Sequence, residues 1–167
     1  MRVPYRRLRR RCEAVLQAFG PIPSFSVETV CTRLSALRGR PLHLLPLPEG
    51  AAAAGACGLW LATDAQDYIF FEQQTSRPHQ EHIVLHEIGH MLFDHPGLEL
   101  LDGLLPSDRL GSPELARRLL ARTDYTTRQE QEAEMLASLI RTVATEPGHG
   151  PDESGEWEAA LGLSRVR

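Results

Sequence analysis

The segment His86-Glu87-Ile88-Gly89-His90 constrains the fold more than any other part of this chain. It lies in a run that follows Pro78, has apolar residues at helical spacing and ends before Pro96-Gly97, and this pattern predicts a helix. Residues four apart lie on one face of a helix, so the two imidazoles can converge on a single ion. Apolar residues on both flanks predict that the helix is buried (Ile83, Leu85, Ile88 and Leu92).

Gly89 is an unusual residue for the middle of such a helix. Glycine is less favourable there than alanine by about 1 kcal/mol. Its presence is explained if another backbone passes close by. The chain offers a candidate, because a second helix is predicted from 127 to 144 and carries the small residues Ala133 and Ala137 on one stripe.

The residue types of the motif match a hydrolytic zinc site. Glu87 is rotated by about 100° from His86, too far to complete a tetrahedron but close to a water in the open coordination position. Zinc lowers the pKa of such a water, and a carboxylate can take its proton as the water attacks a peptide carbonyl and then deliver it to the leaving amine. We therefore predict that His86 and His90 are metal ligands and that Glu87 is the catalytic base.

A catalytic zinc also requires a third protein ligand. His95 follows His90 by five residues, whereas the extended metzincin pattern places its third histidine six residues on. Glu130 lies on the small-residue stripe of the 127–144 helix, although Thr127-x-x-Glu130 is also a capping box. Glu132 points to the other edge of the apolar face, and helical phase alone does not exclude it.

Further residues are candidates for supporting roles. Glu134 lies one turn beyond Glu130 and is a candidate to orient a ligand histidine. The oxyanion formed during peptide hydrolysis needs a hydrogen-bond donor, for which Tyr68, Tyr125 and His149 are eligible. The strand edge near 59–61 is a candidate for pairing with an extended substrate.

The remaining patterns predict an α+β domain. Helical spacing predicts one helix over 5–19 and another that starts at Ser26 and ends at Gly39. Apolar runs predict an edge strand at 41–47, with proline at both ends, and a hairpin of strands at 58–62 and 68–72. We expect a small antiparallel sheet packed on the motif helix and on further helices. Residues 97–112 predict an irregular connection, and Ser112-Pro113-Glu114 predicts a helix start.

The length of 167 residues fits one compact domain. We assign residues 1–146 to it, with a basic helix and linker at 1–25 and the core at 26–146, and residues 147–167 to a tail rich in glycine, proline and acids. Three widely spaced cysteines predict neither a disulfide framework nor a cysteine-rich metal site. The sequence contains no apolar run of the roughly 20 residues that a membrane helix needs and no signal-peptide pattern, so we expect a cytoplasmic protein.

Charge is distributed unevenly along the chain. Six arginines and no acid fall within the first 11 residues, while the other 12 arginines face 22 acidic residues. An arginine-rich arm can contact nucleic acid or an acidic partner, but it is also typical of a solvated helix face. Since the body is acidic, we do not expect direct nucleic-acid binding.

Together these residues resemble the ImmA/IrrE family of bacterial metallopeptidases, which belong to the wider gluzincin class. The resemblance covers roughly Ser26 to Ala144 and includes the passage from Tyr68-Ile69-Phe70-Phe71 through Arg77-Pro78-His79-Gln80-Glu81-His82 to the motif. It also includes Glu130-x-x-Ala133-Glu134-x-x-Ala137, which looks like the family's downstream element. Since the first Glu of that element is the family's third zinc ligand, the resemblance implies Glu130. The chain departs from the family at Glu134, where Asp or Asn is usual, and at Leu136, which replaces an aromatic residue.

The resemblance implies a minimal zincin-like gluzincin with one zinc ion. It also implies narrow proteolysis, because such proteins cleave a regulatory protein, often a helix-turn-helix transcriptional repressor, and relieve repression after stress. We therefore expect a zinc endopeptidase that cleaves a specific intracellular regulator. The alternative is a non-proteolytic regulator or toxin–antitoxin partner with structural or sensory zinc. The presence of Glu87 favours the enzyme, because a structural site needs no carboxylate there.

Overall fold

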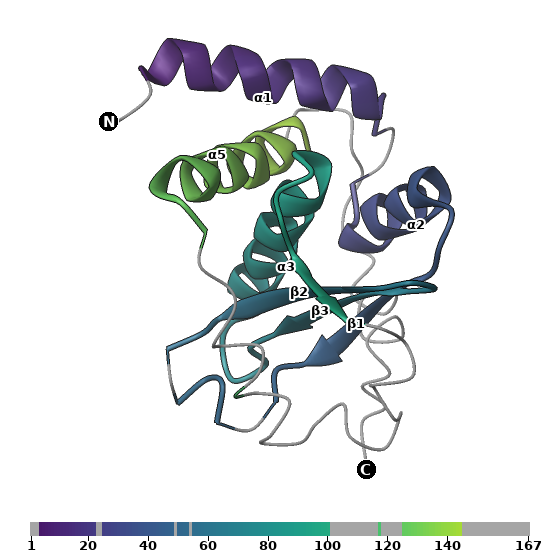
Figure 1. Cartoon of the computed structure of the whole chain (residues 1–167). Coiled ribbons are helices and arrows are strands. Elements are labelled where there is room, and N and C mark those ends of the chain that lie inside the picture. The colour runs from purple at the N-terminus through teal and green to yellow at the C-terminus, as the bar shows by residue number, and fades with distance from the viewer. Residues whose placement is uncertain are drawn as a thin grey trace.

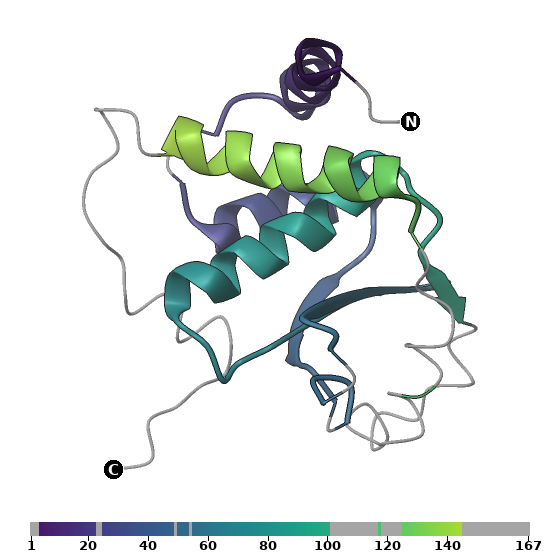
Figure 2. The same ribbon diagram turned by 90° about the vertical axis from the view of Figure 1, so that its left-hand side faces the viewer.

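The structure is a computed structural model that describes residues 4–22, 25–48, 50–53, 55–100, 117 and 125–144. The described part of the chain is an α+β fold in which helices are stacked above a sheet (Figures 1 and 2). The main elements, in chain order, are α1 (Tyr5–Phe19), α2 (Val27–Arg38), β1 (Leu42–Pro46), β2 (Gly58–Thr63), β3 (Asp67–Phe71), α3 (Arg77–Leu92), β4 (Leu98–Leu100) and α5 (Thr127–Ala144).

The helices form layers of increasing distance from the sheet. α3 packs on β2 and β3, and α2 packs on α3 and β1. α5 crosses α3 on the side away from the sheet, and α1 in turn lies across α5 (Figures 1 and 2). The motif helix α3 is therefore enclosed between the sheet and α5.

The sheet has the order β1-β3-β2-β4. The predicted hairpin of β2 and β3 is confirmed as an antiparallel pair, and β1 lies at the edge as predicted. The expectation of an antiparallel sheet was wrong, because β1 pairs with β3 and β4 pairs with β2 in parallel. Both parallel pairs join strands separated by a long connection, which is the condition for parallel pairing. β4 falls within the predicted irregular connection at 97–112.

Alternation along the strands buries both faces of the sheet. On β2, Trp60 and Ala62 face the main core beneath the helices, whereas Leu59 and Leu61 belong to a smaller apolar cluster. β3 behaves in the same way, with Ile69 in the main core and Phe70 in the smaller cluster. β2 and β3 therefore lie between the two apolar clusters, and α3 packs on both strands.

The ends of α2 follow the predicted signals. The Ser26 hydroxyl accepts a hydrogen bond from the backbone N–H of Thr29 at 3.0 Å, which caps the first turn. Gly39 ends the helix in the left-handed conformation, with φ of 67°. Arg38, the last residue of α2, and Arg40 lie on either side of this glycine in the sequence.

These arginines surround a buried carboxylate at the start of β3. Asp67 is fully buried, and its Oδ2 lies 2.6 Å from Arg38 Nε and 3.2 Å from Arg40 Nε. Trp60 Nε1 donates to Asp67 Oδ1 at 3.1 Å. This cluster ties the C-terminal end of α2 to the sheet.

The contact between α3 and α5 is close at one glycine. A Cβ added to Gly89 would lie 2.9 Å from both the Cα and the carbonyl oxygen of Ala133. The expectation of a backbone passing close to Gly89 is thus confirmed, and that backbone belongs to α5.

Several predicted features fall outside the described residues, namely the helix start at Ser112-Pro113-Glu114, the tail at 147–167 and His149. Within the described ranges, no helix has both the length and the apolar character needed to cross a membrane.

Candidate metal centre

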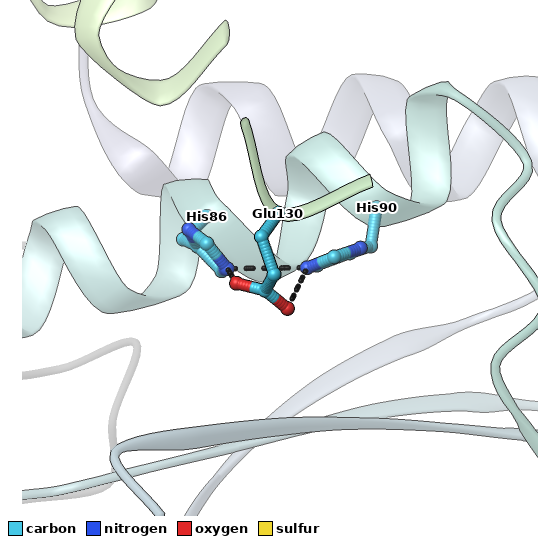
Figure 3. A group of neighbouring side chains, drawn as sticks. All are labelled: His86, His90 and Glu130. Carbon is cyan, nitrogen blue, oxygen red and sulfur yellow. Dashed lines mark hydrogen bonds and ion pairs between the residues drawn. The ribbon is translucent and has the colours of Figure 1, made fainter. Parts of the chain in front are cut away.

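Three predicted ligands meet between α3 and α5. His86 and His90 project from successive turns of α3, and Glu130 reaches them from the first turn of α5 (Figure 3). His86 Nε2 lies 3.1 Å from His90 Nε2 and 3.2 Å from Glu130 Oε2. The other carboxylate oxygen of Glu130 lies 3.6 Å from His90 Nε2. In the described part of the chain, these three residues form a group that could hold a metal ion.

The spacing of these atoms agrees with that around a tetrahedral ion. With zinc–ligand bonds of about 2 Å, neighbouring ligand atoms stand about 3.4 Å apart. The observed separations of 3.1 to 3.6 Å bracket this value. A cation can therefore be accommodated without rearranging the two helices.

Glu130 is available because another pair caps α5. The Thr126 hydroxyl accepts from the Gln129 backbone N–H at 3.3 Å, and the Gln129 side chain accepts from the Thr126 backbone N–H at 2.9 Å. The capping box thus lies one residue before the Thr127-x-x-Glu130 alternative. The carboxylate of Glu130 is free to face the histidines.

Burial and charge favour the ligand-competent protonation states. Burial and the neighbouring His86 lower the pKa of His90 to about 3, so its ring is neutral at physiological pH. The hydrogen bond to His86 lowers the pKa of Glu130 and keeps it ionised. Burial opposes protonation of His86, but the hydrogen bond to Glu130 and the charge of Glu87 raise its pKa overall. Metal binding requires neutral imidazoles and ionised carboxylates, so an ion displaces at most a proton from His86.

Glu87 lies beside the three predicted ligands but is not a member of their group. Its side chain is buried, and within the described residues its Oε2 has no hydrogen-bond partner. Burial raises its pKa to about 7. A buried polar atom without a partner is costly, so this oxygen points to a function in which another group meets it.

Gly58 at the start of β2 provides the space for Glu87. A Cβ at Gly58 would lie 2.8 Å from Glu87 Oε1 and 2.6 Å from Ile83 Cγ2. The sequence did not single out Gly58, because glycine is common in the turns that precede strands.

The group opens into a cleft of about 480 Å³. One wall is formed by the chain leading into β2, including Cys57, Gly58 and Leu59, and the opposite wall by α3 and α5. The site is thus accessible to a ligand larger than water.

Tyr125 is the oxyanion candidate that lies at this cleft. Its ring stacks on His90 with centroids 3.7 Å apart and planes 14° apart. Its buried hydroxyl has no hydrogen-bond partner in the described ranges. Burial raises its pKa above the ordinary value, so the hydroxyl keeps its proton and is a donor. By contrast, Tyr68 stacks on His43 and Phe70 and does not line the cleft.

Glu134 lies where a supporting role was expected. Its Oε2 is 3.3 Å from His86 Nδ1, on the side of the ring opposite the ligand nitrogen. The same carboxylate is held by His82 Nε2 at 2.9 Å. This arrangement fixes the orientation of the His86 ring.

The two alternative third ligands, His95 and Glu132, lie outside the ligand group. His95 Nδ1 is 2.9 Å from His90 Nδ1, on the far side of that ring. Glu132 Oε2 is 2.9 Å from His95 Nε2, one step further from the cleft. The structure therefore favours Glu130 as the third member of the group.

No family model, no curated protein and no solved structure matches this chain. The chemistry of the site is inferred from its own residues.

Proposed function

We propose that this protein is a zinc-dependent endopeptidase with zincin-like packing of α3 on the sheet. The ligands are His86, His90 and Glu130, and Glu87 is the catalytic base. The observation that carries the proposal is the buried carboxylate of Glu87, whose free oxygen lies beside three correctly spaced ligands. A structural metal site has no use for such a group, and it normally closes its fourth position with another ligand.

The donor set supports zinc over harder cations. Imidazole nitrogens suit zinc and other transition metals, whereas magnesium and calcium prefer oxygen ligands. Two histidines and one glutamate with an open fourth position form the donor set of zinc peptidases. When bound, the ion supplies an acidified water and polarises a carbonyl oxygen.

The roles of the chain's own residues follow from their positions. Glu87 Oε2 has the free lone pairs needed to accept a proton at the cleft, and it can return that proton to a leaving amine. A cation beside Glu87 favours its ionised form and offsets the effect of burial. The Tyr125 hydroxyl is a protonated donor at the same cleft and is our candidate to stabilise the oxyanion.

The shape of the cleft supports an extended peptide as substrate. Among the described residues, β4 pairs with β2 only at residues 61–63. The first residues of β2, Gly58 and Leu59, precede this pairing and line the cleft. A peptide can add to such an edge through backbone hydrogen bonds. From the resemblance to ImmA/IrrE peptidases, we further propose that the substrate is an intracellular regulator, such as a helix-turn-helix repressor.

The test combines zinc quantification with a cleavage assay on helix-turn-helix repressors, chosen first from any encoded beside the gene for this protein. Wild type and Glu87→Gln are expected to bind one zinc per chain, while cleavage falls by about 10²- to 10⁴-fold in the variant. His86→Gln should lose both zinc and cleavage. His43→Gln, at an exposed histidine of β1, is the control that should keep both.

Two outcomes would count against the enzyme. Cleavage by Glu87→Gln at the wild-type rate would exclude Glu87 as the base. Tight zinc binding without cleavage of any tested regulator, together with stable binding of that regulator, would favour the non-proteolytic alternative.

A further inference from the structure

A chain of buried polar groups extends behind His90, on the side away from the cleft. His90 is fully buried, and its Nδ1 lies 2.9 Å from His95 Nδ1. The other ring nitrogen of His95 lies 2.9 Å from Glu132 Oε2. Nothing in the peptidase mechanism proposed above uses His95 or Glu132.

The direction of these hydrogen bonds follows from the carboxylate. Glu132 Oε1 is paired with the guanidinium groups of Arg128 and Arg11, so the carboxylate acts as the acceptor and His95 Nε2 as the donor. A neutral His95 then donates through Nε2 and presents the lone pair of Nδ1 to His90. His90 must in turn carry its proton on Nδ1, which leaves the lone pair of Nε2 facing the ligand group.

One carboxylate oxygen of Glu132 contacts His95, and the other contacts two arginines. Its side chain is 3% exposed, and Oε1 lies 3.0 Å from Arg128 Nε and 3.1 Å from Arg11 Nε. Arg128 precedes Glu132 by one turn of α5, whereas Arg11 comes from α1. The N-terminal helix is thereby linked to the metal group through three consecutive contacts.

Aromatic stacking holds the rings in place. Phe93 stacks on His95 with centroids 5.4 Å apart and planes 9° apart, and Arg11 in turn lies over the Phe93 ring. Tyr125 covers one face of His90. Rotation of either histidine would break this packing as well as the hydrogen bonds.

We infer that His95 and Glu132 are positioning residues that hold the proton of His90 on Nδ1 and its Nε2 toward the metal, with Arg11 of α1 completing the network. The inference rests on the ligand role of His90 in the proposed function, but not on peptidase activity. Partners of metal-bound histidines typically contribute about 10- to 100-fold to metal affinity.

The experiment measures the zinc dissociation constant by competition with a chromogenic chelator. His95→Leu keeps the bulk of the ring but cannot accept from His90, so zinc binding should weaken by about 10- to 100-fold. His95→Gln has an oxygen to accept and an amide to donate, and it should recover part of that loss. His43→Leu, at the exposed histidine of β1, should bind zinc as wild type does.

A second measurement reports the tautomer without any metal. Imidazole nitrogen shifts in metal-free protein should show the proton of His90 on Nδ1 in wild type and a mixture of tautomers in His95→Leu. Thermal unfolding of the metal-free variants identifies any that fail to fold. Glu132→Gln retains an acceptor for His95 but lacks the charge, so its affinity should fall less than that of His95→Leu.

The results separate this inference from the proposed function. Unchanged zinc affinity and tautomer in folded His95→Leu would overturn the positioning role even if cleavage proceeds. Equal losses in His95→Leu and His95→Gln, in step with lower unfolding temperatures, would also overturn it and show a packing role. A wild type that binds zinc but cleaves nothing would refute only the peptidase. A wild type that binds no zinc would refute both.

Discussion

Gly89→Ala directly tests the contact between α3 and α5 that brings Glu130 to the two histidines. The added methyl would lie 2.9 Å from the Cα and the carbonyl oxygen of Ala133, and 3.2 Å from its Cβ. Two of these atoms belong to the backbone of α5, so a change of side-chain rotamer cannot relieve the contact. α5 has to move by roughly half an ångström to restore ordinary van der Waals distances.

The expected energy is a balance of two opposed terms. Alanine favours the helix over glycine by about 1 kcal/mol. Overpacking of a close-packed core costs about 1–3 kcal/mol. The net effect is a loss of about 1 kcal/mol in the free energy of unfolding, which corresponds to a decrease of about 2–4 °C in the unfolding temperature of a chain of this size.

The effect on metal binding should exceed the effect on stability. Glu130 lies one turn before Ala133 on α5, so a displaced α5 carries it away from His86 and His90. A binding constellation tolerates errors of only about 0.5 Å, and we expect zinc affinity to fall by about tenfold or more. The double variant Gly89→Ala/Ala133→Gly should not recover, because the backbone contacts remain.

The assay is urea unfolding of the metal-free protein combined with chelator competition for zinc. Ser138→Ala, on the exposed side of α5, serves as the control and should alter neither quantity. A Gly89→Ala variant about 1 kcal/mol more stable than wild type, with unchanged zinc affinity, would show that α5 does not press on this glycine.

Three further predictions concern stability. In metal-free protein, burial raises the pKa of Glu87 to about 7 from 4.5, so the folded state binds this proton more tightly and stability falls as pH rises between these values. Urea unfolding at several pH values should therefore show Glu87→Gln more stable than wild type by about 3 kcal/mol above pH 7. The difference should be absent below pH 4.5, and a pH-independent difference would contradict this reasoning. Asp67→Ala leaves Arg38 and Arg40 unpaired beside a buried strand and should lower the free energy of unfolding by about 3 kcal/mol, so a loss below about 1 kcal/mol would mean that solvent already compensates these charges. Ser26→Ala removes the cap of α2 and should cost about 1 kcal/mol in thermal unfolding without changing zinc affinity; weakened zinc binding would show that α2 supports the site.

Most of the helices and strands could be predicted, because the residues that cap an element or set its apolar period lie within that element's own stretch of sequence. Ser26 and Gly39 mark the two ends of α2, and the spacing of apolar residues predicted the positions of α3 and α5. The parallel pairing of β1 with β3 and of β4 with β2 was missed, because it depends on where long connections return the chain. No pattern within a strand of three residues such as β4 encodes that choice.

The ligand group was predictable in part for the same reason. His86 and His90 share one helix, and their spacing alone brings them together. The choice between Glu130 and Glu132 depended on which edge of α5 faces α3, and helical phase alone leaves that edge open. Contact at Gly89 decides it, since the edge of α5 that meets this glycine presents Glu130 to the histidines.

The position of His95 could not be derived from helical periodicity. α3 ends at Leu92, and Asp94 has a left-handed φ of 51° that turns the chain back. The backbone N–H of His95 then donates to the carbonyl of His90 at 3.0 Å. His95 is out of phase with the helix, but this turn brings its side chain back to His90. The five-residue spacing from His90 produces this contact only because of the turn.

The ligand group is divided between α3 and α5, so an ion bound there would link the two helices and stabilise the tertiary structure. A ligand present at 1,000 times its dissociation constant stabilises the folded state by about 4 kcal/mol. Depletion of the ion would remove that contribution at the α3–α5 contact, and α1 packs on α5. The cellular lifetime of the protein, as well as its chemistry, should then follow the supply of metal, with the ion-free chain the preferred target of housekeeping proteases.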